Sequence, residues 1–272
     1  MSSSHSKPAA ERPYTELCTH SQTSIHYRDD NLAEDILGQR GFTDVLFSQI
    51  LGRRPDAHDL RVLDAALIAI MEHGLTPSAI ATRMVYMSSP ENIQSGVAAG
   101  LLAVGSQFVG TVENSAILLR QLIDAPEGVE AAARVAVQAH RAARKPIPGF
   151  GQHMHKPDDP RAARLLAIGR EHPRFEGRYL QAIEILSREV DAAFGKHITI
   201  NATGAVGTLL GELGVPPTLM RGFAVISRAA GLVAHIAEEQ RVPSARFVWD
   251  LVDHEVPYRG AGEGHNKERN AP

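Results

Sequence analysis

The sequence predicts an all-α protein, and three observations support this fold class. Apolar residues recur at the three- and four-residue steps of a helix face along most of the chain. Strand signals are sparse, because the one stretch that alternates clearly, residues 197–201, is short. Of the 272 residues, 43% are hydrophobic and 22% are charged, so the chain can bury a real core.

The spacing places three helices in particular. The first has the apolar positions Leu60, Leu63, Leu67 and Ile70, and Gly74 is expected to end it. The second has Tyr179, Ile183, Leu186 and Val190. The third follows Pro216 and Pro217, and its predicted apolar face is Leu219, Phe223, Ile226, Ala230, Val233 and Ala237. Residues 92–104 are small and apolar on all sides, which is typical of a buried helix, and residues 129–144 form an alanine-rich amphipathic one.

Bulk properties exclude several classes of function. A net charge of −3 offers no electrostatic footprint for nucleic acid, and no apolar run approaches the ~20 residues that span a bilayer. The single cysteine, Cys18, cannot form a disulfide within the chain, and no signal peptide is visible, so a cytoplasmic location is expected. Met1–Pro13 and Gly260–Pro272 are too polar to pack and are expected to be mobile tails.

Two segments rich in Gly, Pro, His and Asn interrupt the helices, residues 145–160 and 197–204. Loops held on a rigid scaffold are where function concentrates. In the first loop, Gly149 and Gly151 would let the main chain approach a ligand closely. Its proton- and anion-binding side chains are His153, His155, Lys156 and, just after it, Arg161. On the pattern alone, a carboxylate site and a solvated connecting loop are equally good interpretations.

Other candidate groups have a simpler explanation when taken one by one. His153 and His155 lack a third ligand at a recognised spacing, so no metal site is predicted. His73 falls at a helix C-terminus, where a capping histidine is the plainer interpretation. Arg228, His235 and Glu238 share a helix face opposite the apolar one, which is typical of a solvated face. No dinucleotide, Walker A or nucleophile-elbow motif is present in the sequence.

The order of several segments, however, resembles one family. They are YRDDNLAEDILGQRGFTDVLFSQILGRRP at 27–55, EHG at 72–74, VAAGLLAVG at 97–105, PGFG with KPDDPRA at 148–162, and ISRAAGLVAHIAEEQ at 226–240. In this order, from about residue 25 to about residue 260, they resemble citrate synthases and citryl-CoA lyases. Where citrate synthases carry the histidine of HGGAN, this chain has Phe108 and Val109. That feature resembles the citryl-CoA lyase branch, including the lyase module of ATP-citrate lyase, and favours cleavage over synthesis.

The resemblance implies an architecture and a set of site residues. It implies a large discontinuous helical domain of residues 14–105 and 216–259, a small domain of residues 106–215, a site in the cleft between them, and a homodimer or higher homo-oligomer. The substrate-binding residues that it implies are His73, Arg161, Phe108 and, more loosely, Arg246. The residues that it implies for coenzyme A are Pro148, Gly149, Phe150, Gly151 and Lys156. The acyl-CoA thioester and a small carboxylate are the expected substrates, without a tightly bound cofactor, metal, nucleic acid or membrane partner.

Two catalytic positions depart from the family pattern. Gln152 stands where the lyase branch has the histidine of GFGH, which holds the keto oxygen, and its amide can still donate a hydrogen bond. Thr203 stands where the family has the aspartate of NVDG, and a hydroxyl is no base near neutral pH. A positioned base contributes ~10²–10⁴-fold, so His153, His155 or His197 is a possible substitute.

Three hypotheses of function remain open. The first is a citryl-CoA type lyase that cleaves a 3-hydroxy-3-carboxyacyl-CoA to acetyl-CoA and a keto acid, or runs the reverse condensation. The second is a related enzyme acting on another acyl-CoA or acceptor. The third is a non-catalytic homologue that binds CoA or a carboxylate.

Overall fold

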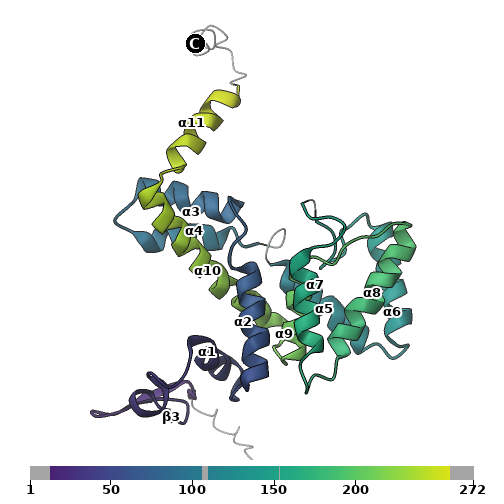
Figure 1. Ribbon diagram of the computed structural model, residues 1–272, viewed down its shortest axis with the longest axis horizontal. Helices are drawn as coiled ribbons and strands as arrows, with labels where there is room; N and C mark the ends of the chain where they lie inside the picture. Colours follow the sequence, from purple (N-terminus) through teal and green to yellow (C-terminus); the bar gives the residue numbers. More distant parts are fainter. Residues whose placement is uncertain (1–12, 106–109, 153, 258–272) are drawn as a thin grey trace, which may run out of the picture. The chain divides into compact units, whose positions relative to one another are not determined.

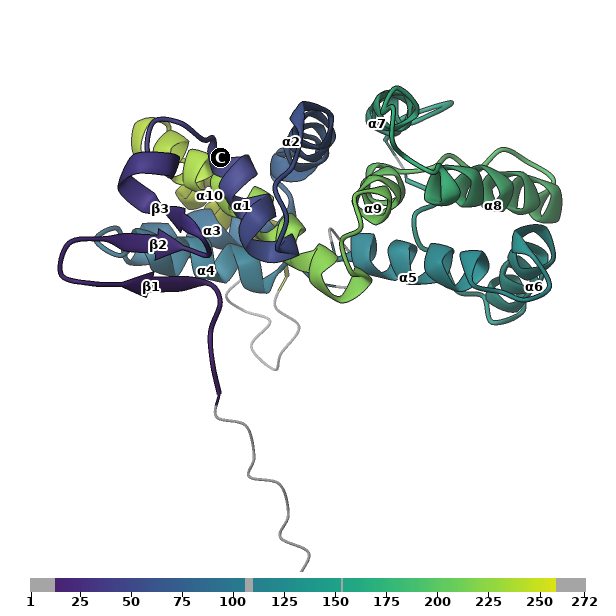
Figure 2. The ribbon, with the colours of Figure 1, turned by 90° about the horizontal axis from the view of Figure 1, so that it is seen from below.

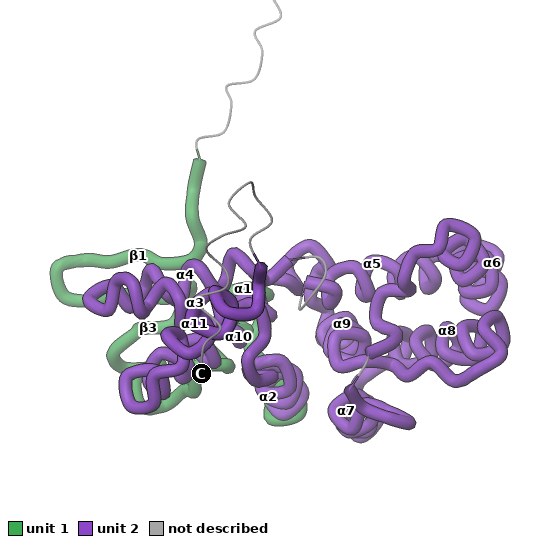
Figure 3. Tube along the Cα trace, turned by 90° about the horizontal axis from the view of Figure 1, so that it is seen from above, with its two compact units in different colours: residues 1–60 green, residues 61–272 purple. Residues whose placement is uncertain are grey.

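The computed structural model describes residues 13–105, 110–152 and 154–257, and the all-α prediction is confirmed. The chain forms two compact units, residues 1–60 and 61–272, which Figure 3 colours separately. Both predicted tails, apart from Pro13, lie outside the described residues, as do Phe108 and His153. The predicted division into residues 14–105 with 216–259, and 106–215, stays a prediction.

The first unit contains a small sheet that the sequence patterns do not predict. Strands β1 (Cys18–His20), β2 (Ile25–Tyr27) and β3 (Asp30–Asn31) pair antiparallel in the order β1-β2-β3. Strands of two or three residues are too short to display the alternation by which strands are recognised. A short π-helix, η1 (Leu32–Ile36), and helix α1 (Phe42–Leu51) follow.

In its described part, every secondary-structure element of the second unit is an α-helix. Its helices are α2 (Ala57–Met71, which begins in the first unit), α3 (Pro77–Ser88), α4 (Ile93–Leu102), α5 (Thr111–Ile123), α6 (Val129–Ala142), α7 (Pro160–Arg170), α8 (Arg178–Phe194), α9 (Ala202–Glu212), α10 (Pro217–Arg241) and α11 (Ala245–Glu255). Helices α5, α7 and α8 pack against α9, which is buried along almost its whole length, and α6 packs against α8 and α5 (Figure 2). Helices α3 and α4 form a hairpin that packs against α10, which also contacts α5 (Figure 1).

Helix α10 exists as predicted, but its buried face was predicted wrongly. Leu219 and Val233 of the predicted apolar face are 46% and 48% exposed, whereas Arg228 and His235 are only 3% and 8% exposed. The reason is close approach between helices. A Cβ on Gly231 would lie under 3.0 Å from the main-chain oxygen of Met71, so only this small-residue face lets α10 lie against the end of α2. Arg228 and His235, which the sequence placed on a solvated face, therefore become core residues.

Helix α4 was expected to be buried on all sides and is only half buried in this chain. Its glycines face the other helices, because a Cβ on Gly100 would lie under 3.0 Å from Thr82 Oγ1. Its opposite side is open: Leu102 is 87% exposed and Ile93 is 44% exposed.

One described helix, α10, is long and apolar enough to cross a membrane by length and composition. Half of its most apolar window is buried within the fold, and a core helix meets the same criterion. This helix therefore carries only weak evidence for a membrane span.

Candidate functional site

Two loops that the sequence singled out lie side by side. Gly151 N donates to Thr199 O at 2.8 Å, Asn201 N donates to Gly149 O at 3.0 Å, and Asn201 Nδ2 donates to Gly151 O at 2.9 Å. Phe150 and Ile200 form an isolated antiparallel bridge. The polar residues of both loops therefore belong to one locality.

The two glycines of the first loop differ in their surroundings. Gly149 has φ +87°, and a Cβ there would lie 2.6 Å from Ser115 Oγ and 3.0 Å from the Cα of Gly204. Close packing on α5 and α9 therefore already requires a glycine at this position. Gly151 has φ +78°, and the nearest atom to a Cβ there is Ile198 Cγ2 at 3.9 Å, so its surroundings leave room for a ligand.

Arg161 is held by the residue that caps its own helix. Asp159 is fully buried, and its Oδ1 accepts from Arg161 N at 3.0 Å at the start of α7. The guanidinium completes a bidentate pair, Nε to Oδ1 at 3.1 Å and Nη2 to Oδ2 at 2.8 Å. Burial raises the pKa of Asp159, but the hydrogen bonds and charge of Arg161 outweigh it, so that pKa lies below its ordinary value. The pair fixes the direction of the Arg161 fork.

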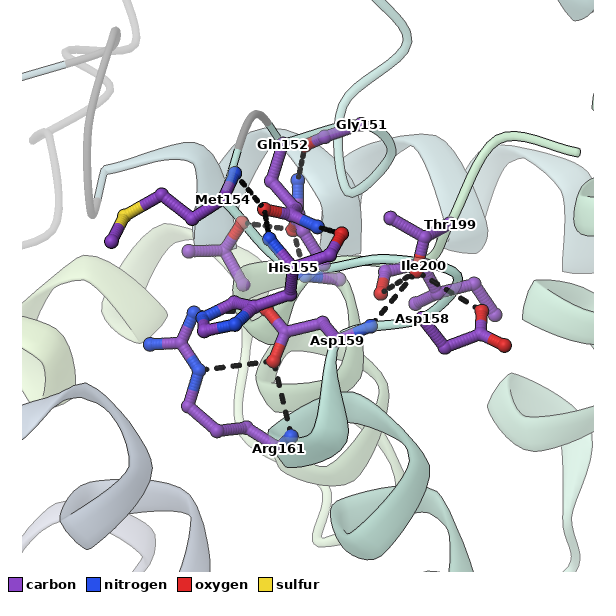
Figure 4. A network of polar contacts seen from close by, with 12 residues as sticks. Gly151, Gln152, Met154, His155, Asp158, Asp159, Arg161, Thr199 and Ile200 are labelled. Atoms are coloured by element: carbon purple, nitrogen blue, oxygen red, sulfur yellow. Dashed lines mark hydrogen bonds and ion pairs between the residues drawn. The ribbon is translucent and has the colours of Figure 1, made fainter.

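His155 and His73 lie with Arg161 in one cluster of nitrogen-bearing side chains. Figure 4 shows the His155 ring beside the Asp159–Arg161 pair. The ring centroids of His73 and His155 lie 6.1 Å apart. The pKa of His73 is lowered, first by partial loss of water and then by the charges of Arg161, His155 and Arg228. His73 is therefore biased towards the neutral imidazole, which can either donate or accept a proton.

Arg228 is a candidate site residue that the sequence analysis placed on a solvated face. Its side chain is buried, and its Nε and Nη1 atoms have no hydrogen-bond partner among the described residues. Burial lowers the pKa of this guanidinium below its ordinary value. A buried cation with open donors is costly unless an anion joins it, so the position is suited to a carboxylate. The available signal was Gly231, which marks the face of α10 that lies against another backbone.

The side chain of Gln152 forms hydrogen bonds within its own loop. Its Oε1 accepts from the main-chain N of Met154 and of His155, both at 2.6 Å, and its Nε2 donates to His155 O (Figure 4). The side chain of Gln152 is therefore bound to the backbone of Met154 and His155. One N–H bond of the amide remains for any other acceptor.

Thr203 is likewise used structurally. Its hydroxyl donates to Asn201 Oδ1 at 2.7 Å and lies 2.8 Å from Thr111 Oγ1. The contact joins the first turns of α9 and α5. Thr203, which stands where the family pattern has an aspartate, thus joins the N-terminus of α9 to the N-terminus of α5.

His197, one of the substitutes for the missing base, is occupied on both ring nitrogens. Nδ1 lies 2.8 Å from Asp191 Oδ2, and Nε2 lies 2.8 Å from Asp158 Oδ1. The hydrogen bonds to Asp191 and Asp158 raise the pKa of His197. In this arrangement no ring nitrogen is left for a substrate.

The structure does not bring Arg246 to the cluster. It lies on α11, pairs with Asp250 at 2.9 Å, and places its guanidinium 4.8 Å from the centre of the Trp249 ring. None of its contacts recorded for the described residues reaches Arg161 or Arg228. Its predicted role in binding a substrate carboxylate stays a prediction.

A pocket of about 390 Å³ opens beside the first loop. Its floor is apolar, formed by Ile147, Phe150, Val190, Phe194 and Ile198. Its rim is basic, formed by His140, Arg141, Arg144 and Lys145. An apolar floor with a cationic rim suits a ligand that has a flat apolar part and phosphate groups. Of the residues predicted for coenzyme A, Phe150 lines this pocket, while Lys156 is exposed on the same loop.

Comparisons with known sequences extend this picture. Residues 9–247 match the family model described as "Citrate synthase, C-terminal domain". The probable ATP-citrate synthase subunit 1 of Schizosaccharomyces pombe is 22% identical over 258 residues, 88% of this chain but 41% of that protein. The putative citrate synthase 2 of Mycobacterium tuberculosis is 26% identical over 204 residues, 71% of this chain and 52% of that protein. The chain thus spans only about half, or less, of these relatives.

Solved structures give the same result. The citryl-CoA lyase from Hydrogenobacter thermophilus superposes with a TM-score of 0.80 at 30% identity, covering 92% of this chain and 96% of that one. An ATP citrate lyase from Methanosaeta concilii, solved in complex with (3S)-citryl-CoA, superposes with a TM-score of 0.71 at 18% identity, covering 93% of this chain and 43% of that one. At that identity the second likeness indicates the fold alone.

Proposed function

The chain belongs to the citrate synthase family of enzymes, and from this premise we propose that it is a CoA-thioester carbon–carbon lyase of the citryl-CoA type. It cleaves a 3-hydroxy-3-carboxyacyl-CoA to acetyl-CoA and a keto acid, or catalyses the reverse condensation. The observation that carries this proposal is Arg228, a buried arginine of which two nitrogens have no hydrogen-bond partner in the part of the chain that the structure describes.

Arg161 and Arg228 support a substrate that carries carboxylates. Arg228 lies within electrostatic range of Arg161, and both lower the pKa of His73. Among the described residues, no ion pair within 4.0 Å compensates Arg228, whereas Arg161 is directed by Asp159. The two arginines suit two carboxylates of one substrate, because an anion at Arg228 offsets a buried cation and Arg161 presents a guanidinium whose direction Asp159 fixes.

The imidazoles supply the proton chemistry in this proposal. In cleavage, His155 accepts the proton of the tertiary hydroxyl, the C–C bond breaks, and the electron pair passes to the thioester as an enolate. His155 then gives this proton to the CH2 carbon of the enolate, which becomes the methyl group of acetyl-CoA, and the keto acid is the other product. His73, biased towards its neutral form, donates a hydrogen bond to the developing keto acid. His153 remains an alternative base, and it lies outside the described residues.

The pocket of about 390 Å³ supports the thioester part of the substrate. Its basic rim suits the phosphates of coenzyme A, and its apolar floor suits the adenine ring. The exposed apolar side chains Leu102, Ile93, Leu219 and Val233 support a homo-oligomer, because a second copy of the chain can cover them. The expected absence of a tightly bound cofactor stays a prediction.

A second candidate function follows from the structural use of Gln152 and Thr203. Both side chains are engaged in contacts that hold loops and helix ends. A related enzyme that acts on another acyl-CoA or acceptor would have no need of the family's histidine and aspartate at these positions.

The test is direct turnover of (3S)-citryl-CoA, followed as acetyl-CoA by mass spectrometry. Arg228→Ala and His155→Ala are compared with Arg188→Ala, which removes an exposed arginine on α8. We expect turnover by the wild type and by Arg188→Ala, and loss of at least tenfold in kcat/KM for the other two. Binding of CoA without turnover, together with turnover of a different hydroxyacyl-CoA, would favour the second candidate. Absence of CoA binding would contradict both.

A further inference from the structure

A buried polar network lies behind the site, and the proposed chemistry does not use it. Arg83 on α3 is 3% exposed, and its Nε and Nη2 atoms both reach His235 Nδ1, at 3.0 and 2.8 Å. Its Nη1 donates to Glu239 Oε2 at 2.7 Å, and it also pairs with Glu238. Because Nδ1 accepts from a guanidinium, the ring proton of His235 is on Nε2.

The protonated nitrogen of His235 faces the segment that carries His73. Nε2 lies 2.9 Å from Glu72 Oε2, although the two groups are not aligned for a hydrogen bond. The other oxygen, Oε1, accepts from the main-chain N of His73 at 2.8 Å and of Gly74 at 2.5 Å. One carboxylate thus links the buried histidine to the backbone on either side of the Cα of His73.

The same carboxylate also acts on Arg228. The negative charge of Glu72 favours the charged form of this guanidinium, against the effect of burial. Gly231 lies between Arg228 and His235 on α10, and a Cβ there would lie 3.2 Å from Glu72 Oε2. Because Glu239 already neutralises Arg83, the charge of Glu72 is left for Arg228.

We propose that Arg83 and His235 are positioning residues for the substrate site. Arg83 holds the ring of His235, and that ring lies 2.9 Å from the Glu72 carboxylate and limits its position. Glu72 in turn accepts from the backbone of His73 and provides the nearby negative charge for Arg228. This inference rests on the proposed function in one respect, namely that His73 and Arg228 bind the carboxylates of the substrate.

The experiment compares three variants of the full chain. His235→Ala removes both contacts of the ring. His235→Gln keeps an acceptor for Arg83 and a polar group beside Glu72. Ser227→Ala is the matched control, because it removes a buried hydrogen bond from α10 to Leu67 O, at 2.5 Å, without touching Glu72.

The first readout is amide hydrogen exchange at His73 and Gly74, which reports on the Glu72 contacts without reference to turnover. We expect exchange at both amides to be about tenfold faster in His235→Ala, near the wild-type rate in His235→Gln, and unchanged in Ser227→Ala. Unchanged exchange in His235→Ala, with a melting temperature lowered as in Ser227→Ala, would overturn the proposal. The network would then serve only to pack α3 against α10.

The second readout is steady-state kinetics with citryl-CoA. We expect His235→Ala to raise KM about tenfold with a smaller change in kcat, because carboxylate contacts hold the ground state and transition state alike. His235→Gln should restore most of the affinity. If the wild type does not turn over citryl-CoA, the proposed function fails, and the exchange rates still decide whether His235 positions His73.

Discussion

Gly231 offers the sharpest test of how α10 is seated. In Gly231→Ala, the added Cβ would lie under 3.0 Å from Met71 O and 3.1 Å from the carbonyl carbon of Met71, both backbone atoms that cannot rotate away. Alanine stabilises a helix interior by about 0.5–1 kcal/mol relative to glycine. Overpacking against backbone costs roughly 1–3 kcal/mol or more, so a net loss of about 1–2 kcal/mol is expected.

The same helix provides the control. Gly222 also lies within α10, and a Cβ there would meet no atom within 4 Å. Gly222→Ala should therefore stabilise the protein by about 0.5–1 kcal/mol. Urea denaturation and thermal melting measure both variants, and for a chain of this size 1 kcal/mol corresponds to roughly 2–4 °C. The reasoning is refuted if Gly231→Ala is as stable as the wild type or gains stability alongside Gly222→Ala.

Three further predictions test the site. Arg228→Met should raise the melting temperature of the ligand-free protein, since it removes a buried charge whose Nε and Nη1 have no hydrogen-bond partner among the described residues, and it should abolish stabilisation by citrate. A wild-type response to citrate would contradict this. His197, whose raised pKa reflects its bonds to Asp191 and Asp158, should titrate above an ordinary histidine by NMR. The contribution of His197 to stability is full below its unfolded-state pKa and is lost as the pH rises through its folded-state pKa. Asp158→Asn should lower the pKa of His197 in the folded protein. An unchanged pKa in this variant would show that the Asp158 carboxylate does not raise it. Thr203→Val should lose about 1–2 kcal/mol of stability, measured by urea denaturation, while the folded molecules keep their turnover. Loss of turnover at full stability would mean that the hydroxyl takes part in the reaction.

The fold class followed from local signals, which the chain displays strongly. The periodic residues of α2 and α8 lie in the predicted helices, and their positions Leu63 and Ile183 are fully buried. The first-unit sheet was missed because its strands are held by pairing between segments rather than by a pattern within any one of them.

The site was predicted in part. His155 in the first loop and Arg161 at the start of α7 lie close to His73. The family resemblance implied that His73 and Arg161 belong to one site, whereas residue spacing alone did not. Arg228 was misplaced on a solvated face, since a stripe of Leu, Ile and Val is the usual mark of a buried one. The structural use of Gln152 depends on turn geometry that no pattern in the sequence reports.

The sequence by itself determined that the chain is helical, where its main helices run, and which two loops carry its polar chemistry. These properties depend on neighbours within a few residues along the chain. Only the tertiary structure decided which face of α10 is buried, because that choice rests on contacts such as Ser227 Oγ to Leu67 O, across 160 residues. A glycine-lined face admits a second backbone where a leucine-lined one cannot, and the closeness of that approach buried Arg228 beside the site.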